Sequence, residues 1–372
     1  MWRALVLWLA CAAGIAGCER SPSLDSGVAL DSVLGGAANA GFTRADAPRR
    51  FEFPDDHNVH PEFRNEWWYI TGNLRSEDGR PFGYQITFFR AGLSAEPTVS
   101  ASLWSTNAFW MAHFAITDVD SGDHRHASRF ARDGALAGQS QQPFSVWLDD
   151  WRLTGMGDGN GAEFPWQLDA RAEGFEISLM LSPVKPMVLN GDAGLSHKGG
   201  DLGNASYYYS ATRLESTGRL AVGEESLTVT GLSWLDREWS TSALAAGTVG
   251  WDWFSLQLDS GHDLMLYQLR QEDGSAHPAS AGTLVAPDGT AIHLQQSDFT
   301  LEPVRTWSAP DGRRYPVRWR VAVPQLALDA VVDAQVDAQW MNTVVVYWEG
   351  TVSVRDAGGT EMGLGYLEMT GY

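Results

Sequence analysis

Cysteine is nearly absent from this chain of 372 residues: the only two, Cys11 and Cys18, lie within the first 18 residues. The remainder of the chain therefore has neither disulfide bonds nor thiol chemistry available to it. Both cysteines stand in or next to an apolar run, residues 4–17, that follows Arg3 and is too short to span a bilayer. A positive start, a short apolar run and small residues at its end are typical of a secretory signal peptide.

The end of this run, Ile15-Ala16-Gly17-Cys18, resembles the bacterial lipobox. It predicts a lipoprotein signal peptide over residues 1–18, with Cys18 as the lipidated first residue of the mature protein; an ordinary signal peptide cut nearby is the alternative. Residues 19–50 are rich in Ser, Gly, Ala and Asp without periodicity, which predicts a flexible tether. We expect a periplasm-facing protein of the bacterial cell envelope, and Glu19 after the cysteine favours the outer over the inner membrane.

Positive charge is also scarce, since 26 Lys and Arg residues face 46 Asp and Glu residues and the net charge is −20. This balance argues against nucleic-acid binding, which needs clustered Lys and Arg. No phosphate-binding loop, dinucleotide fingerprint or nucleophile elbow occurs in the sequence. The histidine pairs His57/His60 and His124/His126 have weak metal-ligand spacing and no cysteine or His-Glu motif beside them, so we predict neither a metal nor a cofactor.

Long helical periodicity is missing as well, and short apolar runs separated by Gly, Pro and Asp-Gly turns continue from about residue 51 to the end. Residues 281–294, AGTLVAPDGTAIHL, show the hairpin pattern clearly. We predict an all-β protein of two antiparallel barrel or sandwich domains, residues 51–242 and 243–372. The 17 tryptophans suit either a ligand pocket or a barrel core.

Residues 231–240, GLSWLDREWS, alternate like a strand but place an indole and a charge on both faces. Trp234, Asp236 and Glu238 share one face, and Leu235, Arg237 and Trp239 share the other. In a functional interpretation, Arg237 and Trp239 grip a ligand while Asp236 and Glu238 point toward the second domain. The alternative is a charge network between the domains, with Asp236 and Glu238 paired to Arg213, Arg270 or Lys198, because charges on an apolar strand must be paired or wet.

Several long motifs resemble one known family: HPEFRNEWWYITGNL (60–74), GYQITFFR (83–90), GLSWLDREWS (231–240), GWDWFSLQLDSG (250–261), YWEG (347–350) and GYLEMTGY (365–372). On these motifs the chain is similar to the lipocalin-like family of AttH-type proteins, which is grouped with the carotenoid 1,2-hydratases (hydroxyneurosporene synthases). The resemblance implies two lipocalin-like β domains packed together.

The hydratases protonate a terminal isoprenoid double bond and add water to the tertiary cation without a cofactor. Their Asp-His-Asn-Trp stretch corresponds here to Asp236–Trp239, with Arg237 in place of the histidine. Their Tyr-x-Asp pair corresponds to Tyr267, with Leu269 where the aspartate stands. An alkene is a very poor base, so this chemistry requires a protonated carboxyl group. The AttH branch is named for a companion role beside an ABC transporter.

Three carboxylates are candidate acids: Glu66, Asp236 and Glu238. Glu66 stands among aromatic residues and is expected either to have a raised pKa or to pair with Arg64 or Arg90. The candidate ligand-binding residues are Trp68, Tyr69, Lys185, Tyr208, Arg237, Trp239, Trp251, Trp253 and Tyr267. Lys185 and Tyr208 belong to residues 181–214, which we expect to be a long irregular loop at a barrel mouth.

We therefore expect a lipid-anchored envelope protein that binds a hydrophobic or amphipathic small molecule or lipid in a lipocalin-like cavity, with an ABC transporter permease as a candidate partner. The alternative is a carotenoid 1,2-hydratase-like enzyme, a hydro-lyase or hydrolase acting on an isoprenoid or lipid. A third hypothesis is an interaction module without a small ligand.

Overall fold

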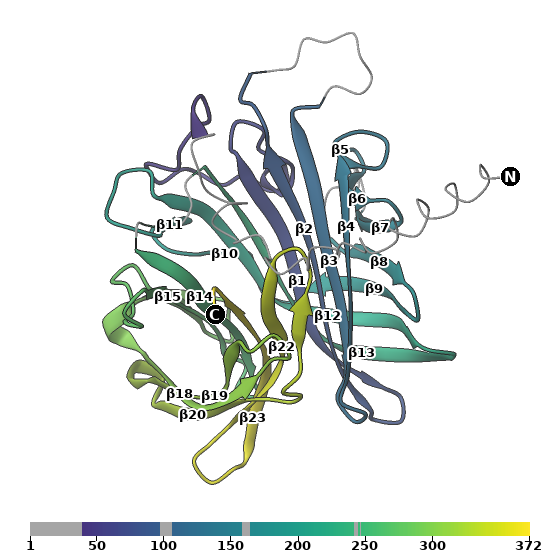
Figure 1. Cartoon of the computed structure of the whole chain (residues 1–372), viewed down its shortest axis with the longest axis vertical. Helices are drawn as coiled ribbons and strands as arrows, with labels where there is room; N and C mark the ends of the chain where they lie inside the picture. The colour runs from purple at the N-terminus through teal and green to yellow at the C-terminus, as the bar shows by residue number, and fades with distance from the viewer. Residues whose placement is uncertain (1–38, 97–105, 158–163, 242–244, 246) are drawn as a thin grey trace, which may run out of the picture.

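Two antiparallel β-sheets make up the protein (Figure 1). The computed structural model describes residues 39–96, 106–157, 164–241, 245 and 247–372. Within these ranges the helical segments are three short 3-10 turns, η2 (Asp55–His57), η3 (Gln296–Asp298) and η4 (Pro324–Leu326). None of the described helices is long and apolar enough to cross a membrane. The predicted all-β fold of two lipocalin-like domains is confirmed.

The first sheet runs in the order β4-β3-β2-β1-β13-β12-β9-β8-β7-β6-β5, and β10 and β11 also pair with β12. Its strands are β1 (Asn65–Ser76), β2 (Pro81–Gly92), β3 (Ala108–Asp118), β4 (Asp123–Arg132), β5 (Ala137–Gln141), β6 (Phe144–Leu148), β7 (Trp151–Gly155), β8 (Trp166–Ala172), β9 (Phe175–Pro183), β10 (Val188–Leu189), β11 (Leu195–His197), β12 (Ala205–Val222) and β13 (Glu225–Ser240).

The second sheet runs in the order β17-β16-β15-β14-β23-β22-β20-β19-β18, and β21 pairs with β22. Its strands are β14 (Thr248–Leu258), β15 (Asp263–Gln271), β16 (Ala281–Val285), β17 (Ala291–Gln295), β18 (Thr300–Ser308), β19 (Arg314–Val323), β20 (Leu328–Ala334), β21 (Trp340–Asn342), β22 (Val346–Arg355) and β23 (Glu361–Thr370). The chain passes from one sheet to the other between Ser240 and Thr248.

Each sheet curls around a hydrophobic core of its own, and the two cores have no residue in common. The core of the first sheet contains large side chains from both of its halves, among them Trp68, Trp110, Trp151 and Trp166. The core of the second sheet is built mainly from β14, β15, β19, β20, β22 and β23. Four of the 17 tryptophans are therefore core residues that fill the inside of the first sheet.

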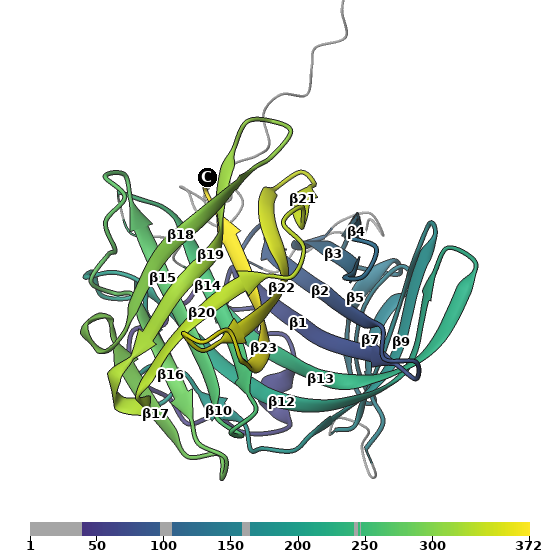
Figure 2. The same ribbon diagram turned by 90° about the horizontal axis from the view of Figure 1, so that it is seen from below.

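The outer faces of β1, β2, β12 and β13 pack against the outer faces of β14, β22 and β23, as Figure 2 shows. On β1, Trp68 and Ile70 belong to the first core, whereas Tyr69 packs with Trp253 between the sheets. Both faces of these strands are thus buried. This explains why residues 231–240 carry an indole and a charge on each face.

Polar contacts hold the two sheets together. Asn73 Nδ2 donates to the Gly365 carbonyl at 3.1 Å. A Cβ atom on Gly83 would lie 2.7 Å from the side chain of Thr351, so glycine permits the close approach of β2 and β22. Arg213 Nη2 pairs with Asp263 Oδ1 at 2.6 Å across the same junction.

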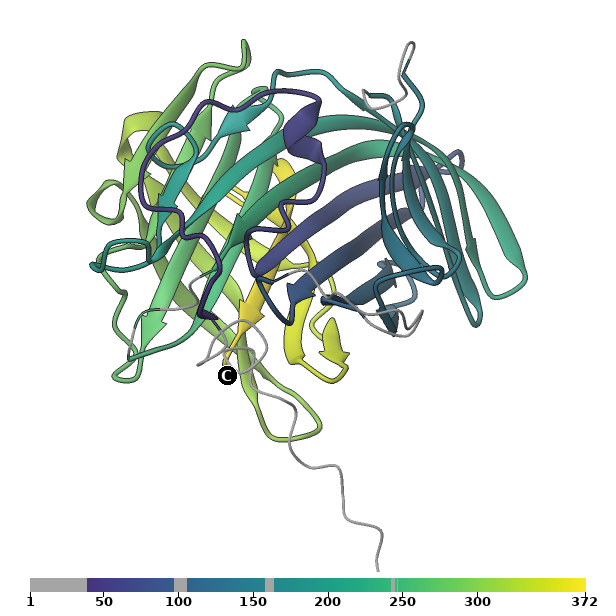
Figure 3. The same ribbon diagram turned by 90° about the horizontal axis from the view of Figure 1, so that it is seen from above.

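The segment before β1 differs from the prediction of a flexible tether over residues 19–50. Residues 39–50 belong to a chain segment that crosses β12 and β13 (Figure 3), and Phe42 and Ala45 are buried in it. The Thr43 nitrogen donates to the Glu62 carbonyl at 2.8 Å, and the Tyr207 hydroxyl donates to the Ala47 carbonyl at 2.8 Å. Two buried apolar side chains and these hydrogen bonds hold the segment against the sheets, although its small and polar residues alone predict flexibility. The predicted signal peptide, including Cys18, lies outside the described residues.

The expected irregular loop over residues 181–214 is also partly wrong. Strand β12 already begins at Ala205, and its next residues pair with β13 in register, Tyr208 opposite Glu238. Tyr208 therefore faces the second sheet, while Tyr207 and Tyr209 face the crossing segment. The consecutive tyrosines have the high β propensity that a long strand needs.

Phe42 provides a test of the packed segment. It is 8% exposed, so Phe42→Ala should lower the free energy of unfolding by about 3–4 kcal/mol, the lower part of the range for buried aromatic deletions. The half-exposed Phe130 is the matched control, and Phe130→Ala should change stability by less than about 0.5 kcal/mol. Chemical denaturation of both variants measures the difference, and equal stabilities would show that this segment does not pack on the sheets.

Candidate functional site

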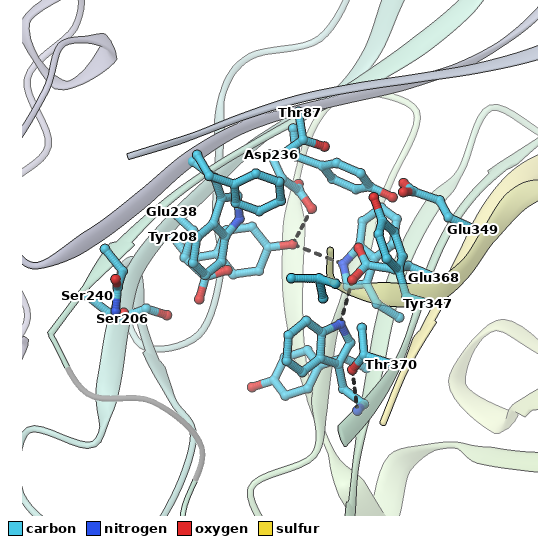
Figure 4. Close-up of a pocket in the computed structure, with 18 of the residues that line it drawn as sticks. Thr87, Ser206, Tyr208, Asp236, Glu238, Ser240, Tyr347, Glu349, Glu368 and Thr370 are labelled. Carbon is cyan, nitrogen blue, oxygen red and sulfur yellow. Dashed lines mark hydrogen bonds between the residues drawn. The ribbon is translucent and has the colours of Figure 1, made fainter. Parts of the chain in front are cut away.

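A cavity of about 140 Å³ lies between the two sheets (Figure 4). It is bordered by β1, β2, β3, β12 and β13 on one side and by β14, β15, β22 and β23 on the other. Its lining residues are Asn65, Trp67, Tyr69, Thr87, Phe89, Met111, His113, Lys198, Ser206, Tyr208, Asp236, Glu238, Ser240, Trp251, Trp253, Tyr267, Leu269, Val345, Tyr347, Glu349, Glu368 and Thr370. The sequence predicted a ligand cavity inside a barrel, whereas this cavity lies between the two sheets.

Aromatic rings form most of the wall. Tyr69 meets Trp253 edge to face at 5.1 Å between ring centroids, and Trp67 lies 6.4 Å from Phe89. Trp251 and Trp253 stand two residues apart on β14, so both indoles face the same space. The lining residues that remain partly exposed are Trp67, Phe89, Lys198, Trp251 and Glu368, so the cavity opens among them.

Two carboxyl groups face each other on neighbouring strands. Glu349 of β22 and Glu368 of β23 are direct cross-strand partners, and both line the cavity. Burial raises the pKa of Glu349 to about 7. Burial, and next the nearby Glu349 charge, raise the pKa of Glu368 well above its ordinary value. Like charges cannot both be held in so small a buried space, so the pair retains a proton at neutral pH.

The Glu349 carboxyl is only partly hydrogen-bonded. Gln85 Nε2 donates to Oε2 at 2.8 Å. The Tyr69 and Tyr347 hydroxyls also lie against this carboxyl group and favour its ionised form. Their alignment is poor: Oε1 and the Tyr69 hydroxyl, both in residues at least 95% buried, have no hydrogen bond of normal geometry within the described part of the chain. On Glu368, by contrast, Trp251 Nε1 donates to Oε1 at 3.0 Å.

Asp236 is a third carboxyl group with a raised pKa. Burial raises its pKa to about 7, in spite of three donated hydrogen bonds that favour the ionised form. The donors are the Tyr208 hydroxyl at 2.6 Å, the Ser210 hydroxyl at 2.5 Å and Trp234 Nε1 at 2.7 Å. Trp253 Nε1 donates in turn to the Tyr208 hydroxyl at 3.2 Å, which connects the Asp236 cluster to the second sheet (Figure 4).

Glu238, in contrast, has a cationic partner. Lys198 Nζ lies 3.3 Å from Glu238 Oε1 and 4.3 Å from the centre of the Tyr267 ring. The pKa of Lys198 is raised: burial acts to lower it, and the attraction of Glu238 outweighs that effect. This ammonium group therefore stays charged and neutralises Glu238 at one end of the cavity.

A hydrogen-bonded row supports the carboxyl pair from the other sheet. Gln85 Nε2 also donates to the Tyr347 hydroxyl at 3.1 Å, and that hydroxyl lies 2.7 Å from His113 Nδ1. Burial lowers the pKa of His113 to about 3, so its ring is neutral.

The structure brings together seven residues that the sequence analysis proposed for the site: Tyr69, Tyr208, Asp236, Glu238, Trp251, Trp253 and Tyr267. Asp236 and Glu238 do point toward the second domain, and Lys198 is the cation paired with Glu238, as the alternative interpretation of residues 231–240 anticipated. Leu269, which stands where the hydratases carry an aspartate, also lines the cavity.

Arg237 and Glu66 lie elsewhere, and their expected roles are corrected. Arg237 is fully buried on the face of β13 turned away from the cavity, with its Nη2 atom 2.5 Å from Glu66 Oε2. Arg90 also pairs with Glu66, at 2.9 Å. Burial acts to raise the pKa of Glu66, but the Arg237 charge and further partners outweigh it and lower the pKa to about 2. Glu66 is therefore ionised and unsuited as an acid.

Trp68, Trp239 and Lys185 are likewise outside the cavity lining. The guanidinium of Arg237 stacks on Trp68 at 3.8 Å, and Trp239 stacks on His60 at 3.8 Å, so both indoles cover the buried ion pair. Lys185 Nζ pairs with Asp263 Oδ2 at 2.7 Å and joins the two sheets. Strand alternation separates these residues from the cavity, because each is on the opposite face or in a loop beyond it.

Glu349 and Glu368 were not proposed from the sequence. Both stand in motifs that carry the family resemblance, YWEG and GYLEMTGY, beside aromatic residues. That pattern is the available signal, but their pairing depends on the register of β22 against β23. Among the described residues, no group of three or more His, Cys, Asp or Glu side chains is arranged to hold a metal ion.

Comparison with known proteins gives four findings. A family model described as AttH-like matches residues 44–372. A crystal structure of a Nitrosomonas europaea protein provisionally identified as AttH is 34% identical, with a TM-score of 0.77 over 88% of this chain and 99% of that one. Kievitone hydratase from Nectria haematococca is 14% identical, with a TM-score of 0.63 over 89% and 96%, and shares the fold. A search of curated proteins finds no match to the sequence.

The Arg237–Glu66 pair gives the second prediction. Arg237→Met should lower the free energy of unfolding by about 3–5 kcal/mol, because it leaves the Glu66 charge buried with one partner fewer. The double variant Arg237→Met, Glu66→Gln should be more stable than the sum of the single changes predicts. Denaturation of the four proteins completes the cycle. Strict additivity would mean that the two charges do not stabilise one another.

Proposed function

The chain belongs to the AttH-like family, and from this membership and the cavity we propose that it adds water to a carbon–carbon double bond of a hydrophobic, isoprenoid-like substrate. Membership agrees with the resemblance predicted from the motifs. Of the functions considered from the sequence, the proposal favours the hydratase-like enzyme over the lipid-anchored binding protein. Both hypotheses require a hydrophobic ligand, which we place between the two sheets.

The observation that carries the proposal is the Glu349–Glu368 pair in an aromatic wall. Protonating an alkene requires a carboxyl group that still holds its proton at neutral pH. The raised pKa values of Glu349 and Glu368 meet this condition, and burial is their first cause. The fold shared with kievitone hydratase, a protein whose name states a hydration, supports the same reaction class.

The reaction balances with this chain's own groups. The proton on Glu349 passes to the less substituted alkene carbon, and the double-bond electrons form the new C–H bond. The more substituted carbon becomes a carbocation, which faces the indoles of Trp251 and Trp253 and is stabilised by their π electrons. A water molecule adds to this carbon, and its excess proton returns to the carboxylate. The product is a tertiary alcohol, and the acid is regenerated.

The size of the cavity limits what enters it. A volume of about 140 Å³ is close to that of an engineered protein cavity that holds one benzene molecule. The branched end of an isoprenoid chain fits this space, and the remainder of a longer substrate must extend through the open side near Trp67 and Trp251. Substrates with a terminal double bond are thus favoured over those with an internal one.

Glu349→Gln tests the reaction directly. The amide keeps the shape and the contact with Gln85 but has no acidic proton, so conversion of geraniol to its hydrated diol should fall at least 100-fold. Mass spectrometry of reactions in isotopically labelled water measures incorporation of oxygen. Glu361→Gln, an exposed position on the same strand as Glu368, should leave the rate unchanged.

The pH dependence of the hydration rate tests whether Glu349 acts as an acid. The active form of Glu349 is protonated and its pKa is near 7, so the rate should be constant below about pH 6 and fall about tenfold per pH unit above about pH 8. A rate that rises with pH would contradict an acid role for this pair. If geraniol and longer acyclic isoprenoids bind but no product forms at any pH, the cavity is a carrier site, as expected for a protein that serves a membrane transporter.

Lipid attachment through Cys18 forms part of the proposal and rests on the lipobox-like sequence alone. Cys18→Ala should release the protein from washed membranes into the soluble periplasmic fraction. Membrane fractionation followed by immunoblotting measures the shift. Continued association of the variant with membranes would contradict a lipid anchor.

A further inference from the structure

The cavity holds more acidic than basic groups. Asp236, Glu238, Glu349 and Glu368 line it, and Lys198 is the single Lys or Arg among the described lining residues. Lys198 is already engaged, because it pairs with Glu238 at 3.3 Å and stacks on Tyr267 at 4.3 Å. The Glu349–Glu368 pair therefore has no cationic partner within the described part of the chain.

A buried oxygen points to what would satisfy this pair. Glu349 is 1% exposed, and its Oε1 atom has no well-aligned hydrogen bond within the described residues, although the Tyr69 and Tyr347 hydroxyls lie against this carboxyl group. A buried carboxyl oxygen without a well-aligned donor is costly when ionised, and an N–H donor that brings a positive charge would satisfy it. The neighbouring Tyr69 hydroxyl interacts with Glu349, but its alignment is also poor, so both groups can take a better-placed partner from a ligand.

The walls fit an alkylated cation better than a hydrated one. Trp251 and Trp253 place two indoles beside Glu368, and Tyr69 packs against Trp253. Indole and phenol faces attract ammonium groups that carry methyl substituents, and the attraction is strongest where water is excluded. Figure 4 shows the carboxyl pair at one end of this aromatic space.

We propose that the cavity binds protonated tertiary amines with an apolar tail, with the ammonium group at the Glu349–Glu368 pair and the N-methyl groups against the tryptophan walls. The proposal rests on the proposed function in one respect: a dimethylalkylammonium ion has the shape and charge of the tertiary carbocation formed there. Such amines are therefore binders in their own right and inhibitors of the hydration.

Three interactions stabilise a bound amine of this kind. It pairs with the single negative charge that the pair carries when one of its two carboxyl groups is ionised, and its N–H bond donates to Glu349 Oε1. Its tail occupies the apolar space lined by Phe89, Met111 and Val345. A neutral ligand of the same shape gains only the last of these contacts, so charge should decide the affinity.

Isothermal titration with three octyl compounds tests this inference. N,N-dimethyloctylamine, protonated at pH 7, should bind at least about tenfold more tightly than N,N-dimethyloctylamine N-oxide, because charge-assisted hydrogen bonds contribute roughly that much or more. N,N,N-trimethyloctylammonium, which is charged but has no N–H bond, should lie between them. Octanoate should not bind measurably. Equal affinities for the amine and its N-oxide would overturn the proposal.

Variants locate the ammonium group. Glu349→Gln and Glu368→Gln should each weaken amine binding by about 10- to 100-fold and leave N-oxide binding within twofold. Glu361→Gln is the matched control and should bind the amine as the unmodified protein does. Circular dichroism verifies the fold of each variant. Amine affinity unchanged in both cavity variants would overturn the assignment.

Binding is measured without turnover, which separates this inference from the proposed function. Charge-selective binding together with no hydration of any alkene would leave the cation site standing and remove the hydratase. Hydration that depends on Glu349, without preference for the amine over its N-oxide, would keep the enzyme and remove the cation site.

Discussion

The buried ion pair between Arg237 and Glu66 is the interaction on which the arrangement of the site depends. It joins β13 to β1 with Nη2 and Oε2 2.5 Å apart, in a register that places Trp68 opposite Arg237. Because successive side chains of a strand point to opposite faces, an Arg237 held inside the first sheet forces Asp236 and Glu238 outward to the second sheet. A slip of one residue would exchange the two sets and remove both carboxyl groups from the cavity.

The same two-sided burial sets the chemistry of the cavity. Strands β1, β13, β22 and β23 have a core on one face and the other sheet on the opposite face, so polar groups at the junction lose water on assembly. Loss of water raises the pKa values of Asp236, Glu349 and Glu368. Glu66 is equally buried, yet two arginines lower its pKa. The partners of each buried carboxyl group therefore decide whether it keeps its proton or forms an ion pair.

Alternation in the sequence predicted which residues share a face, and this was sufficient for the all-β fold and for much of the aromatic wall. It could not show which face of residues 231–240 meets the cavity, because both faces are buried. Arg237 and Trp239 were therefore placed on the wrong side. Glu349 and Glu368 stand 19 positions apart and become partners only through the hairpin register of β22 and β23, which composition alone does not specify. The burial of Phe42 and Ala45 was likewise not predicted, since isolated apolar side chains in a polar segment give no periodic pattern.

Arg237 and Leu269, the two departures from the hydratase pattern, can be judged from their positions relative to the cavity. Arg237, which replaces a histidine, does not touch the cavity, so its identity does not decide whether an acid is present. Leu269 lines the cavity and makes it more apolar at that point, while carboxyl groups from β13, β22 and β23 surround the same space. An acid need only reach the double bond and keep its proton, and several strands around one cavity can satisfy both conditions. In the proposed hydration, the proton donor therefore need not lie on the strand that carries it in the hydratases, because the cavity itself depends on the packing of the two sheets.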